Sequence, residues 1–495
     1  MKDLRIDLKE EFVVLGSGLS AIAATKTFLS QGFPLTVIDA ALNESNCITN
    51  REFKDYQNKF SSPKFKDKNN SFVYASYKKQ IKLKEKNFSS IGSLSKGGLS
   101  NIWGASINHY SEKELEDFFY EKEKKDKAYN FISNILTKKD FSNDISIDYF
   151  KNLYPEINLD KNCLNILNSK ESNSTNISFK TPRNSIFKVD SNNQKDDWIG
   201  KVNDYSIFNA KTEFEKIKHH KKIKMFDNFL IISITKIDDR YQIKTKNLRS
   251  GNHTIFIAKY VFICLGVIST TKLILKMKRE FNKKIKFLTT PAAVLSLISI
   301  SYPKDNNFNL SNLYFEKSSK KNIISGNIFP IEKNLINKTF KNYPIKNLLI
   351  KFLVSLLPRI YMVNIYFSSN YSDNKISLND KNEILIEGKN KPKLKKEFKK
   401  FKKEFLKSIQ NKKLYPLPLF SKLLKPGEDI HYGGTFPMKL NPKNLECNKE
   451  GRLENFKNLY ICDSSSMPFL SGKPHSFNLM VQSHLVVTNF LNSKF

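Results

Sequence analysis

The sequence of 495 residues contains little cysteine, and no two cysteines form a CxxC pair. The five cysteines are Cys47, Cys163, Cys264, Cys447 and Cys462. Their odd number and wide spacing argue against a disulfide framework, an iron–sulfur cluster or a zinc site, and favour a reducing compartment. We therefore expect no metal site.

Long hydrophobic runs are also missing. The N-terminal MKDLRIDLKEEF lacks the apolar core of a signal peptide, and no stretch of about 20 uncharged apolar residues is present. The nearest is 345–363, which is interrupted by lysines, Pro358 and Arg359. It fits a partly buried helix, and it also allows contact with a membrane surface. We expect a cytoplasmic protein, with a peripheral membrane contact as the alternative.

Acidic residues are outnumbered, 48 against 83 Lys and Arg, which gives a formal net charge of +35. Such an excess of positive charge can bind nucleic acid, an anionic membrane or an acidic substrate. However, Lys and Asn are abundant throughout this chain, loops included. No nucleic-acid-binding motif accompanies the charge, so no nucleic-acid partner is expected. The length suggests two domains or one large domain with insertions.

What is present is a strand–glycine–helix–strand pattern over residues 12–39. An apolar run is followed by GxGxxA, in which Gly16 permits a tight turn and Gly18 lets the backbone approach a pyrophosphate. The next helix directs its free N–H groups at the phosphates, and Asp39 ends the second strand, where it can hold ribose hydroxyls. The predicted contacts are Gly16, Ser17, Gly18, Leu19, Ser20 and Asp39. This stretch predicts a dinucleotide fold without separating FAD from NAD, and a βαβ unit that binds nothing is the alternative.

A second glycine-rich stretch, IGSLSKGGLSNIWGAS, covers residues 91–106. Such a cluster of small, polar and aromatic residues can run its backbone against a flat ring system, although an ordinary glycine loop has the same composition. The residues singled out are Gly97, Gly98, Ser100, Asn101, Trp103 and Gly104.

The C-terminal part supplies a third piece. HYGGTFPM (431–438) precedes NLYICD, which reads as a buried strand that ends in Asp463, and an apolar helical stretch begins near His475. An acid at the end of a strand beside a helix N-terminus suits a cofactor rich in phosphate or ribitol.

Together these motifs resemble the glucose–methanol–choline (GMC) family of FAD-dependent oxidoreductases, in a divergent bacterial form. GSGLSA, GGLSNIWG, HYGGTFPM and NLYICDSSSMP follow the family order, and 260–275 resembles the strand, glycine and helix that lead back to the flavin domain. The resemblance implies an α/β fold with a discontinuous, Rossmann-like FAD-binding domain and a β-meander. It also implies cofactor contacts from Leu230, Gly266, Asp463, Ser464, His475, Ser476 and Phe477.

The implied layout divides the chain five ways. The FAD-binding domain is expected from 1–112, 206–285 and 428–495, an irregular connecting or cap segment from 113–205, and a substrate domain from 286–427. That last domain is expected to hold an antiparallel sheet with helices. Alternating strands broken by Asp, Asn and Gly turns are predicted within 365–388, and an amphipathic helix within 394–409.

Two of the seven histidines fall where alcohol oxidation needs a base, His431 and His475. When a hydride leaves the alcohol carbon for flavin N5, the oxygen must lose a proton, and a neutral imidazole can accept it. By resemblance His431 is the base. His475 lies near the position of the family's second catalytic residue, although the usual distance from Asp463 would place that residue at Pro474. The alternative role for His475 is to cap the last helix and only contact the flavin. His484 is predicted to pack in a helix, His219 and His220 to be solvated, and His109 to be structural near the cofactor loop.

The sequence also departs from the family. Pro437 and Lys439 replace residues often seen after the GT pair, and KPH replaces the common Asn-Pro. These changes leave the electron acceptor and the second catalytic residue open. A small-molecule alcohol, favoured to be a sugar, is the expected substrate. The alternatives are a flavin-binding protein without turnover, and a membrane-surface FAD enzyme that acts on a lipid-like or nucleotide-linked substrate.

Overall fold

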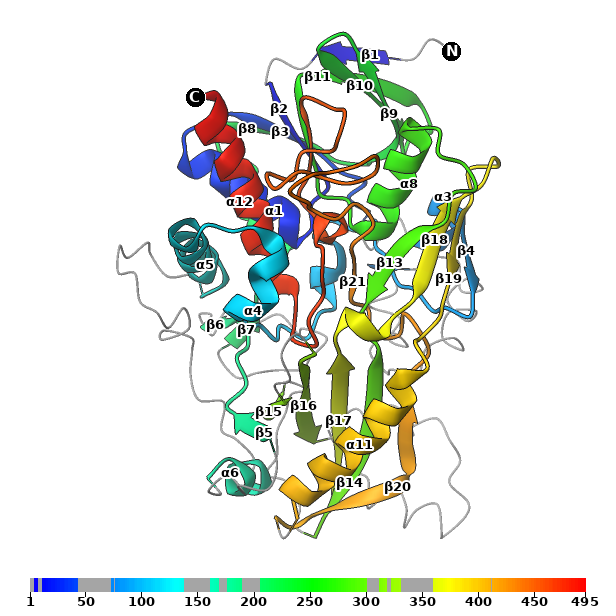
Figure 1. Cartoon of the computed structure of the whole chain (residues 1–495). Helices are drawn as coiled ribbons and strands as arrows, with labels where there is room; N and C mark the ends of the chain where they lie inside the picture. The colour runs from blue at the N-terminus through cyan, green and yellow to red at the C-terminus, as the bar shows by residue number, and fades with distance from the viewer. Residues whose placement is uncertain are drawn as a thin grey trace, which may run out of the picture.

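The computed structural model describes residues 4–7, 11–42, 73–74, 76–137, 161–168, 176–188, 205–300, 311–317, 322–330, 359–410 and 412–495. This part of the chain is a mixed α/β fold with several sheets and helices. Its buried apolar residues gather mainly in two large clusters, one in each half of the molecule drawn in Figure 1.

A five-stranded parallel sheet organises the first half. Its order is β22 (Leu459–Ile461), β12 (Tyr260–Ile263), β2 (Phe12–Leu15), β3 (Leu35–Ile38) and β8 (Ile223–Phe226). Every neighbouring pair is parallel. All of the strands except the edge strand β8 are short, mainly apolar runs buried on both faces, as expected for a covered parallel sheet. Segments from three distant parts of the sequence therefore form one sheet.

Helices and a second sheet cover this parallel sheet (Figure 1). On one side α1 (Leu19–Ser30) packs against α12 (Ser476–Lys494), and the Ser483 hydroxyl donates to the carbonyl of Ser20 at 2.7 Å. The helix α5 (Lys122–Thr137) packs on α12 as well. On the other side lie α8 (Val267–Met277) and the sheet β1 (Leu4–Asp7), β11 (His253–Ala258), β10 (Arg240–Asn247) and β9 (Phe229–Ile237). The predicted meander is confirmed as β9–β11, and β1 adds a parallel strand to it that the sequence analysis does not predict.

A mixed sheet joins the two halves. Its order is β21 (Tyr432–Gly433), β13 (Ile285–Thr289), β18 (Asn374–Leu378), β19 (Ile384–Glu387) and β4 (Leu83–Lys86). Ile376 and Ile386 belong to the same core as the parallel sheet. The segment predicted as one substrate domain, 286–427, is therefore divided between the two cores.

The second half is built on a six-stranded antiparallel sheet. Its order is β20 (Leu414–Leu423), β14 (Ala292–Ser299), β17 (Ile360–Phe367), β16 (Ile324–Pro330), β15 (Leu313–Lys317) and β5 (Ile177–Lys180). The predicted strands within 365–388 are confirmed as the end of β17 together with β18 and β19.

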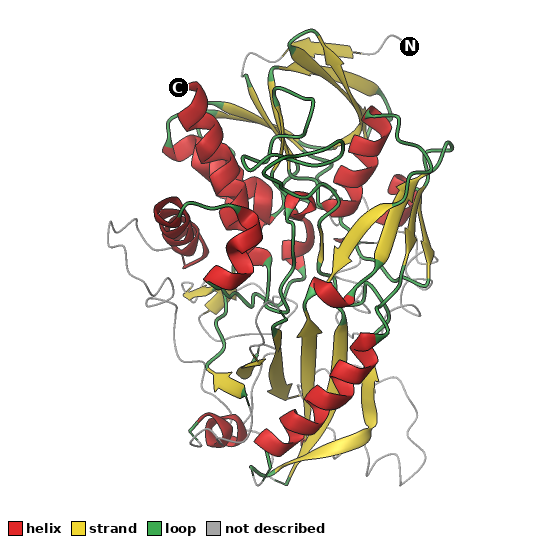
Figure 2. Ribbon diagram, in the orientation of Figure 1, coloured by secondary structure: helices red, strands yellow, loops and turns green. Residues whose placement is uncertain are grey.

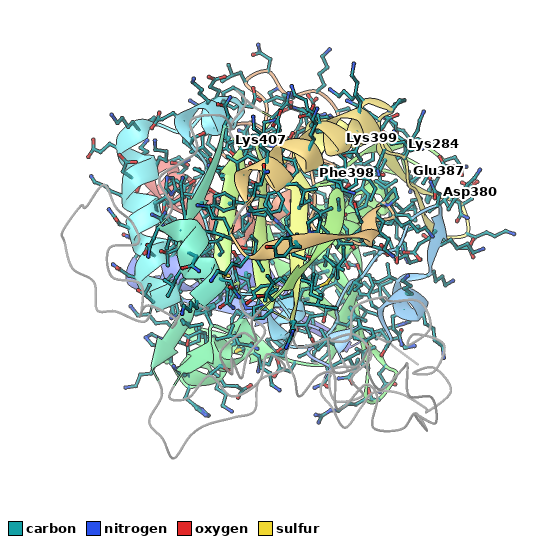
Figure 3. All side chains as sticks on the ribbon, turned by 90° about the horizontal axis from the view of Figure 1, so that it is seen from below. Lys284, Asp380, Glu387, Phe398, Lys399 and Lys407 are labelled. Carbon is teal, nitrogen blue, oxygen red and sulfur yellow. The ribbon has the colours of Figure 1, made fainter. Side chains whose placement is uncertain are left out.

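The helix α11 (Lys393–Ser408) crosses this sheet and confirms the predicted amphipathic helix (Figure 2). The apolar residues that recur every three or four positions along it are buried: Leu394, Phe398, Phe401, Phe405 and, just after the helix, Ile409. Figure 3 shows Phe398 on the sheet side and Lys399 and Lys407 on the outward side. Burying each large side chain contributes about 1.5–3 kcal/mol, so this stripe attaches the helix.

The prediction of an irregular segment over 113–205 is wrong where this segment is described. It contains α5, α6 (Lys161–Leu167) and the hairpin β6 (Ile186–Lys188) and β7 (Tyr205–Ile207) as well as β5. In α5 the buried residues include Ala128, Tyr129 and Ile132, which have helical spacing. The first residues of α5, 122–127, are all charged, so the apolar pattern appears in the sequence only from Ala128 onward.

The remaining helices are short: α3 (Tyr77–Ile81), α4 (Glu112–Leu115) and α7 (Ala210–Ile217), with the 3-10 turns η4 (Gly98–Asn101), η5 (Glu116–Phe118), η8 (Ser369–Tyr371) and η9 (Ser464–Ser466). Of the apolar stretch 345–363, positions 345–358 lie outside the described residues, and its last residues enter β17. Within the described chain, no helix combines the length and apolar character needed to cross a membrane.

Candidate active site

Four predicted residues meet at the carboxyl edge of the parallel sheet. Leu15 lies opposite both Ile38 and Ile263, and Ile263 lies opposite Ile461, so these strands end at the same level. The residues that follow directly or within three positions are Gly16, Asp39, Gly266 and Asp463. In open α/β sheets this edge is where ligands bind.

Gly16 makes the first turn in a conformation that excludes a side chain. Its φ is +108°, and its N–H donates to the carbonyl of Ile38 at 2.9 Å. A Cβ added at this position would lie 2.4 Å from the carbonyl oxygen of Cys264. The turn can therefore pass between β3 and β12 only as glycine.

Ser17 connects the two glycine motifs. Its hydroxyl donates to Asp39 Oδ2 at 2.8 Å and accepts from the N–H of Gly97 at 2.9 Å. A Cβ on Gly98 would lie 3.6 Å from the Cα of Gly18. The two loops that the sequence analysis assigned to one ligand are thus in direct contact.

The polar side chains of the second glycine-rich loop form hydrogen bonds within the protein. Asn101 Nδ2 donates to the carbonyl of Gly98 at 2.8 Å, and Ser100 Oγ accepts from the N–H of Ala210, the first residue of α7. The indole N–H of Trp103 donates to the carbonyl of Phe208 at 2.8 Å. These residues fix the shape of the loop.

The carboxyl of Asp39 is buried, and burial raises its pKa to about 6 despite the hydrogen bonds from Ser17 and the N–H of Ala41. In the unfolded chain an Asp titrates near 3.9. The folded state therefore holds this proton more tightly, and the stability that it contributes is complete below about pH 4 and is lost as the pH rises through 6.

We expect Asp39→Asn to remove this pH dependence. The amide oxygen can still accept from Ser17 but does not ionise, so the parent should lose about 3 kcal/mol more than the variant in free energy of unfolding between about pH 4 and 7. Urea denaturation at several pH values measures the difference. Asp380→Asn, at an exposed site labelled in Figure 3, is the control and should leave the parent profile unchanged. Parallel profiles for parent and Asp39→Asn would contradict the assignment.

Asp463 follows the end of β22 and forms hydrogen bonds with the start of α8. Its Oδ2 accepts from the N–H of Gly266 at 2.9 Å and from Thr270 Oγ1 at 2.5 Å, and its Oδ1 accepts from the N–H of Ser465. Burial raises the pKa of this carboxyl. Ser464 donates its hydroxyl to the carbonyl of Tyr432 and accepts at its own carbonyl from the N–H of Gly434. Asp463 thus links the start of α8 to the segment that carries His431.

His431 and His475 lie together, as the catalytic assignment requires. Their ring centroids are 4.7 Å apart with the planes at 76°, and the ring centroid of Tyr366 in β17 lies 5.0 Å from that of His431. His475 precedes α12 directly, and its Nδ1 is buried with no hydrogen-bond partner among the described residues. Burial lowers the pKa of His475 to about 4, so the ring is neutral near physiological pH.

Two residues that the sequence analysis missed contact His431. Thr290 Oγ1 lies 2.7 Å from His431 Nδ1, and Asp429 Oδ2 accepts from the backbone N–H groups of Thr290 and His431 at 3.0 and 3.3 Å. Asp429 lies two positions before His431 in the sequence, so its closeness to the histidine could have been inferred from the sequence. Thr290 follows β13 and carries no local signal, because only the pairing of β13 with β21 brings it there.

Other predicted residues serve packing. Phe477 is fully buried, with its ring 5.1 Å from Tyr129, and Leu230 on β9 is half-buried against the main core. His484 stacks on Phe131 at 4.3 Å, as predicted for a packed helix residue. The remaining predicted contacts, Leu19, Ser20 and Ser476, lie in the first turns of α1 and α12, and Gly104 is exposed.

Histidines outside the pair follow their predictions where the structure bears on them. His219 and His220 are exposed. His109 is half-buried near Tyr129, and burial lowers its pKa to about 4. The cysteines at 163, 264, 447 and 462 are buried, the last three of them as free thiols, and Cys47 lies outside the described residues.

Comparison of the sequence with protein-family models and with curated proteins gives no match to either.

Proposed function

We propose that the chain is an FAD-dependent oxidoreductase of GMC type that oxidises a CH–OH group, with His431 as the base. The observation that carries the proposal is the pairing of His431 with His475, at 4.7 Å between ring centroids, on segments tied to Asp463 at the ligand edge of the parallel sheet. Motifs far apart in the sequence are thus joined in one place. The parallel sheet, its helices and the β9–β11 sheet support a Rossmann-like FAD-binding fold.

The residues at the sheet edge fit FAD. Gly18 is the N-cap of α1 and offers no side-chain cap, which leaves the first N–H groups of the helix for a pyrophosphate. A Cβ on Gly18 would meet nothing within 4 Å. Asp39 at the end of β3 is placed for ribose hydroxyls. The glycine backbone at 97–98, against Gly18, supplies a flat approach for a ring system.

FAD, when bound, supplies a hydride acceptor, and the protein supplies position and proton transfer. A neutral His431 accepts the hydroxyl proton of the substrate through the nitrogen that does not face Thr290. The neutral His475 beside it orients the same oxygen. Lys473, Pro474 and His475 differ from the family form, but the position still offers an imidazole.

The substrate is a small-molecule alcohol, and we favour a sugar. The Tyr366 ring lies against His431, and burial raises the pKa of its hydroxyl to about 12, so that it remains neutral. A site built to hydrogen-bond a polyol discriminates strongly against substrates that lack those hydroxyls.

Purification with an absorbance spectrum tests the proposal. We expect a yellow protein with bands at about 370 and 450 nm, which an alcohol or sugar bleaches under anaerobic conditions. A colourless protein that takes up no FAD would overturn the cofactor assignment. A yellow protein that no member of an alcohol and sugar panel bleaches would favour a flavin-binding protein without turnover.

We expect Gly18→Val to weaken FAD uptake by at least about tenfold while the protein still folds. The open space at Gly18 accepts the side chain, but that space is the proposed path of the pyrophosphate. FAD titration of the stripped protein measures the affinity, and its thermal midpoint without FAD provides the control. An unchanged affinity would place the pyrophosphate elsewhere.

A further inference from the structure

We propose that the end of the antiparallel sheet farthest from the parallel sheet docks on an anionic membrane surface. This end is drawn lowest in Figure 1, where β14 ends and β20 begins. Ile300, directly after β14, is 64% exposed and Tyr415 in β20 is 48% exposed, and they are two of the six exposed large hydrophobic residues in the described part of the chain. The inference goes beyond the proposed oxidation, because it concerns where the protein binds rather than what it oxidises.

Strand register gathers an apolar patch around these two residues. Ile298 lies opposite Ile360 on one side and opposite Tyr415 on the other, so these three side chains share one face of the sheet. The opposite face is the one that α11 covers, because Leu297 and Tyr361, which alternate with them, belong to the core that contains the α11 stripe. The residues on the shared face at this end, named here the distal patch, are Ile298, Ile300, Phe329, Ile360, Met362 and Tyr415.

The distal patch lies outside the two cores. Each of its members is half-buried or exposed, and none belongs to either large core cluster of the described residues. The contrast is clear along β17, where Ile360 and Met362 are half-buried while Tyr361 and Val363 between and after them are fully buried. A contiguous apolar surface of this kind marks contact with another surface.

The charges around the distal patch favour an anionic partner. Lys412 and Lys413 directly precede β20, and Lys413 is exposed. Lys407, in the last turn of α11, points outward in Figure 3, which shows the molecule from below. The strands that carry the patch, with their flanking residues, contain no Asp or Glu over 292–300, 324–330, 359–367 and 412–425. Lysines at the rim of an apolar surface attract anionic headgroups, while the apolar side chains enter the boundary with the acyl chains.

The course of the chain also favours a membrane. The connection 331–358, which holds most of the apolar stretch 345–363, leaves the sheet after Pro330 and returns before β17. Pro330 lies opposite Tyr361, one residue from Ile360 of the distal patch. The described residues that border this connection therefore lie at the docking end.

A second copy of the chain fits this end less well than a membrane does. β20 is an edge strand, and it carries Pro416 and Pro418, which have no N–H group to donate to an added strand. In a two-fold contact through the distal patch, the lysines at its rim would also face the same lysines of the other copy. An anionic membrane complements both the apolar surface and its positive rim.

Co-sedimentation of the full chain with vesicles tests the proposal. We expect binding to mixed vesicles of phosphatidylcholine and phosphatidylglycerol, and binding at least about tenfold weaker to phosphatidylcholine alone. Ile300→Asp combined with Tyr415→Asp should weaken binding to the mixed vesicles by at least about tenfold, because both substitutions remove apolar area from the docked surface. Ile237→Asp combined with Leu440→Asp is the matched control, since these residues are 42% and 63% exposed outside the antiparallel sheet, and it should bind as the parent does.

A second measurement does not depend on loss of binding. Tyr415→Trp should add fluorescence that lipids brominated in their acyl chains quench in mixed vesicles, whereas the fluorescence added by Leu440→Trp should not be quenched. Lys412→Gln combined with Lys413→Gln should weaken binding to the mixed vesicles by about tenfold and leave binding to phosphatidylcholine unchanged.

Three outcomes would overturn the proposal. The parent could fail to bind mixed vesicles, the aspartate pair could bind as the parent does, or analytical ultracentrifugation could show a parent dimer that the aspartate pair converts to a monomer, which would assign the distal patch to a second copy. Ile360 and Tyr366 are six residues apart on β17, a distance of about 20 Å, so these substitutions leave the proposed active site in place. Because vesicle binding needs neither FAD nor an alcohol, its failure is distinct from failure of the proposed function.

Discussion

His431→Asn is expected to leave a yellow, folded protein that bleaches with its alcohol substrate 10²- to 10⁴-fold more slowly than the parent, the range that a general base typically contributes (about 3–5 kcal/mol). The asparagine amide can reach Thr290 as Nδ1 does, so packing against Tyr366 and His475 should change little. What is lost is a group able to accept the proton of the substrate hydroxyl.

Stopped-flow measurement of anaerobic bleaching gives the rate constant, and the absorbance spectrum shows that the cofactor is retained. His220→Asn, at an exposed position remote from the pair in sequence, is the control and should bleach at the parent rate. A rate within about threefold of the parent for His431→Asn would assign the base to another residue.

Lys473→Met is expected to destabilise the protein by about 3–5 kcal/mol, since it removes the cation from a buried ionic cluster. Lys473 Nζ donates to Glu114 Oε2 at 2.8 Å and lies 3.7 Å from Glu316 Oε1. Side-chain exposure is 7% for the lysine, 0% for Glu114 and 10% for Glu316. Without the ammonium, two carboxylates would be buried side by side.

Urea denaturation gives the change in free energy of unfolding. Lys284→Met is the matched control, because Lys284 pairs with Glu387 at 2.7 Å on the surface (Figure 3), where a pair is worth less than about 1 kcal/mol. If Lys473→Met fails to fold, the double variant with Glu114→Gln should recover a folded protein, because it also removes the buried carboxylate that lies 2.8 Å from the ammonium. Equal effects of the two lysine variants would contradict this account.

The same cluster gives a structural reason for the unusual KPH sequence. Lys473 fixes the turn that delivers His475, through Glu114 of α4 and Glu316 of β15. Substitution of the lysine should therefore also disturb the position of His475. Neither glutamate is near Lys473 in the sequence, so this role could not be predicted from the motif.

Local patterns were sufficient for much of the fold. The glycine turn at Gly16, the strand that ends in Asp463, the helix after His475 and the apolar stripe of α11 all follow from short-range periodicity and turn chemistry. These signals are strong because a buried strand or a helix stripe must be apolar wherever the rest of the chain lies. Where charged residues fill the start of a helix, as at 122–127 in α5, the prediction was wrong.

The sequence by itself determined which residues can turn, cap and bind: the glycines at 16, 18, 97 and 98, the carboxylates at 39 and 463, and the histidines at 431 and 475. Only the tertiary structure decided what those groups can do together. Register in the parallel sheet aligns the ends of its strands, and the pairing of β13 with β21 brings Thr290 to His431. The physical reason is range: turns and stripes depend on neighbours within a few residues, whereas a proton's position depends on hydrogen bonds made across the fold.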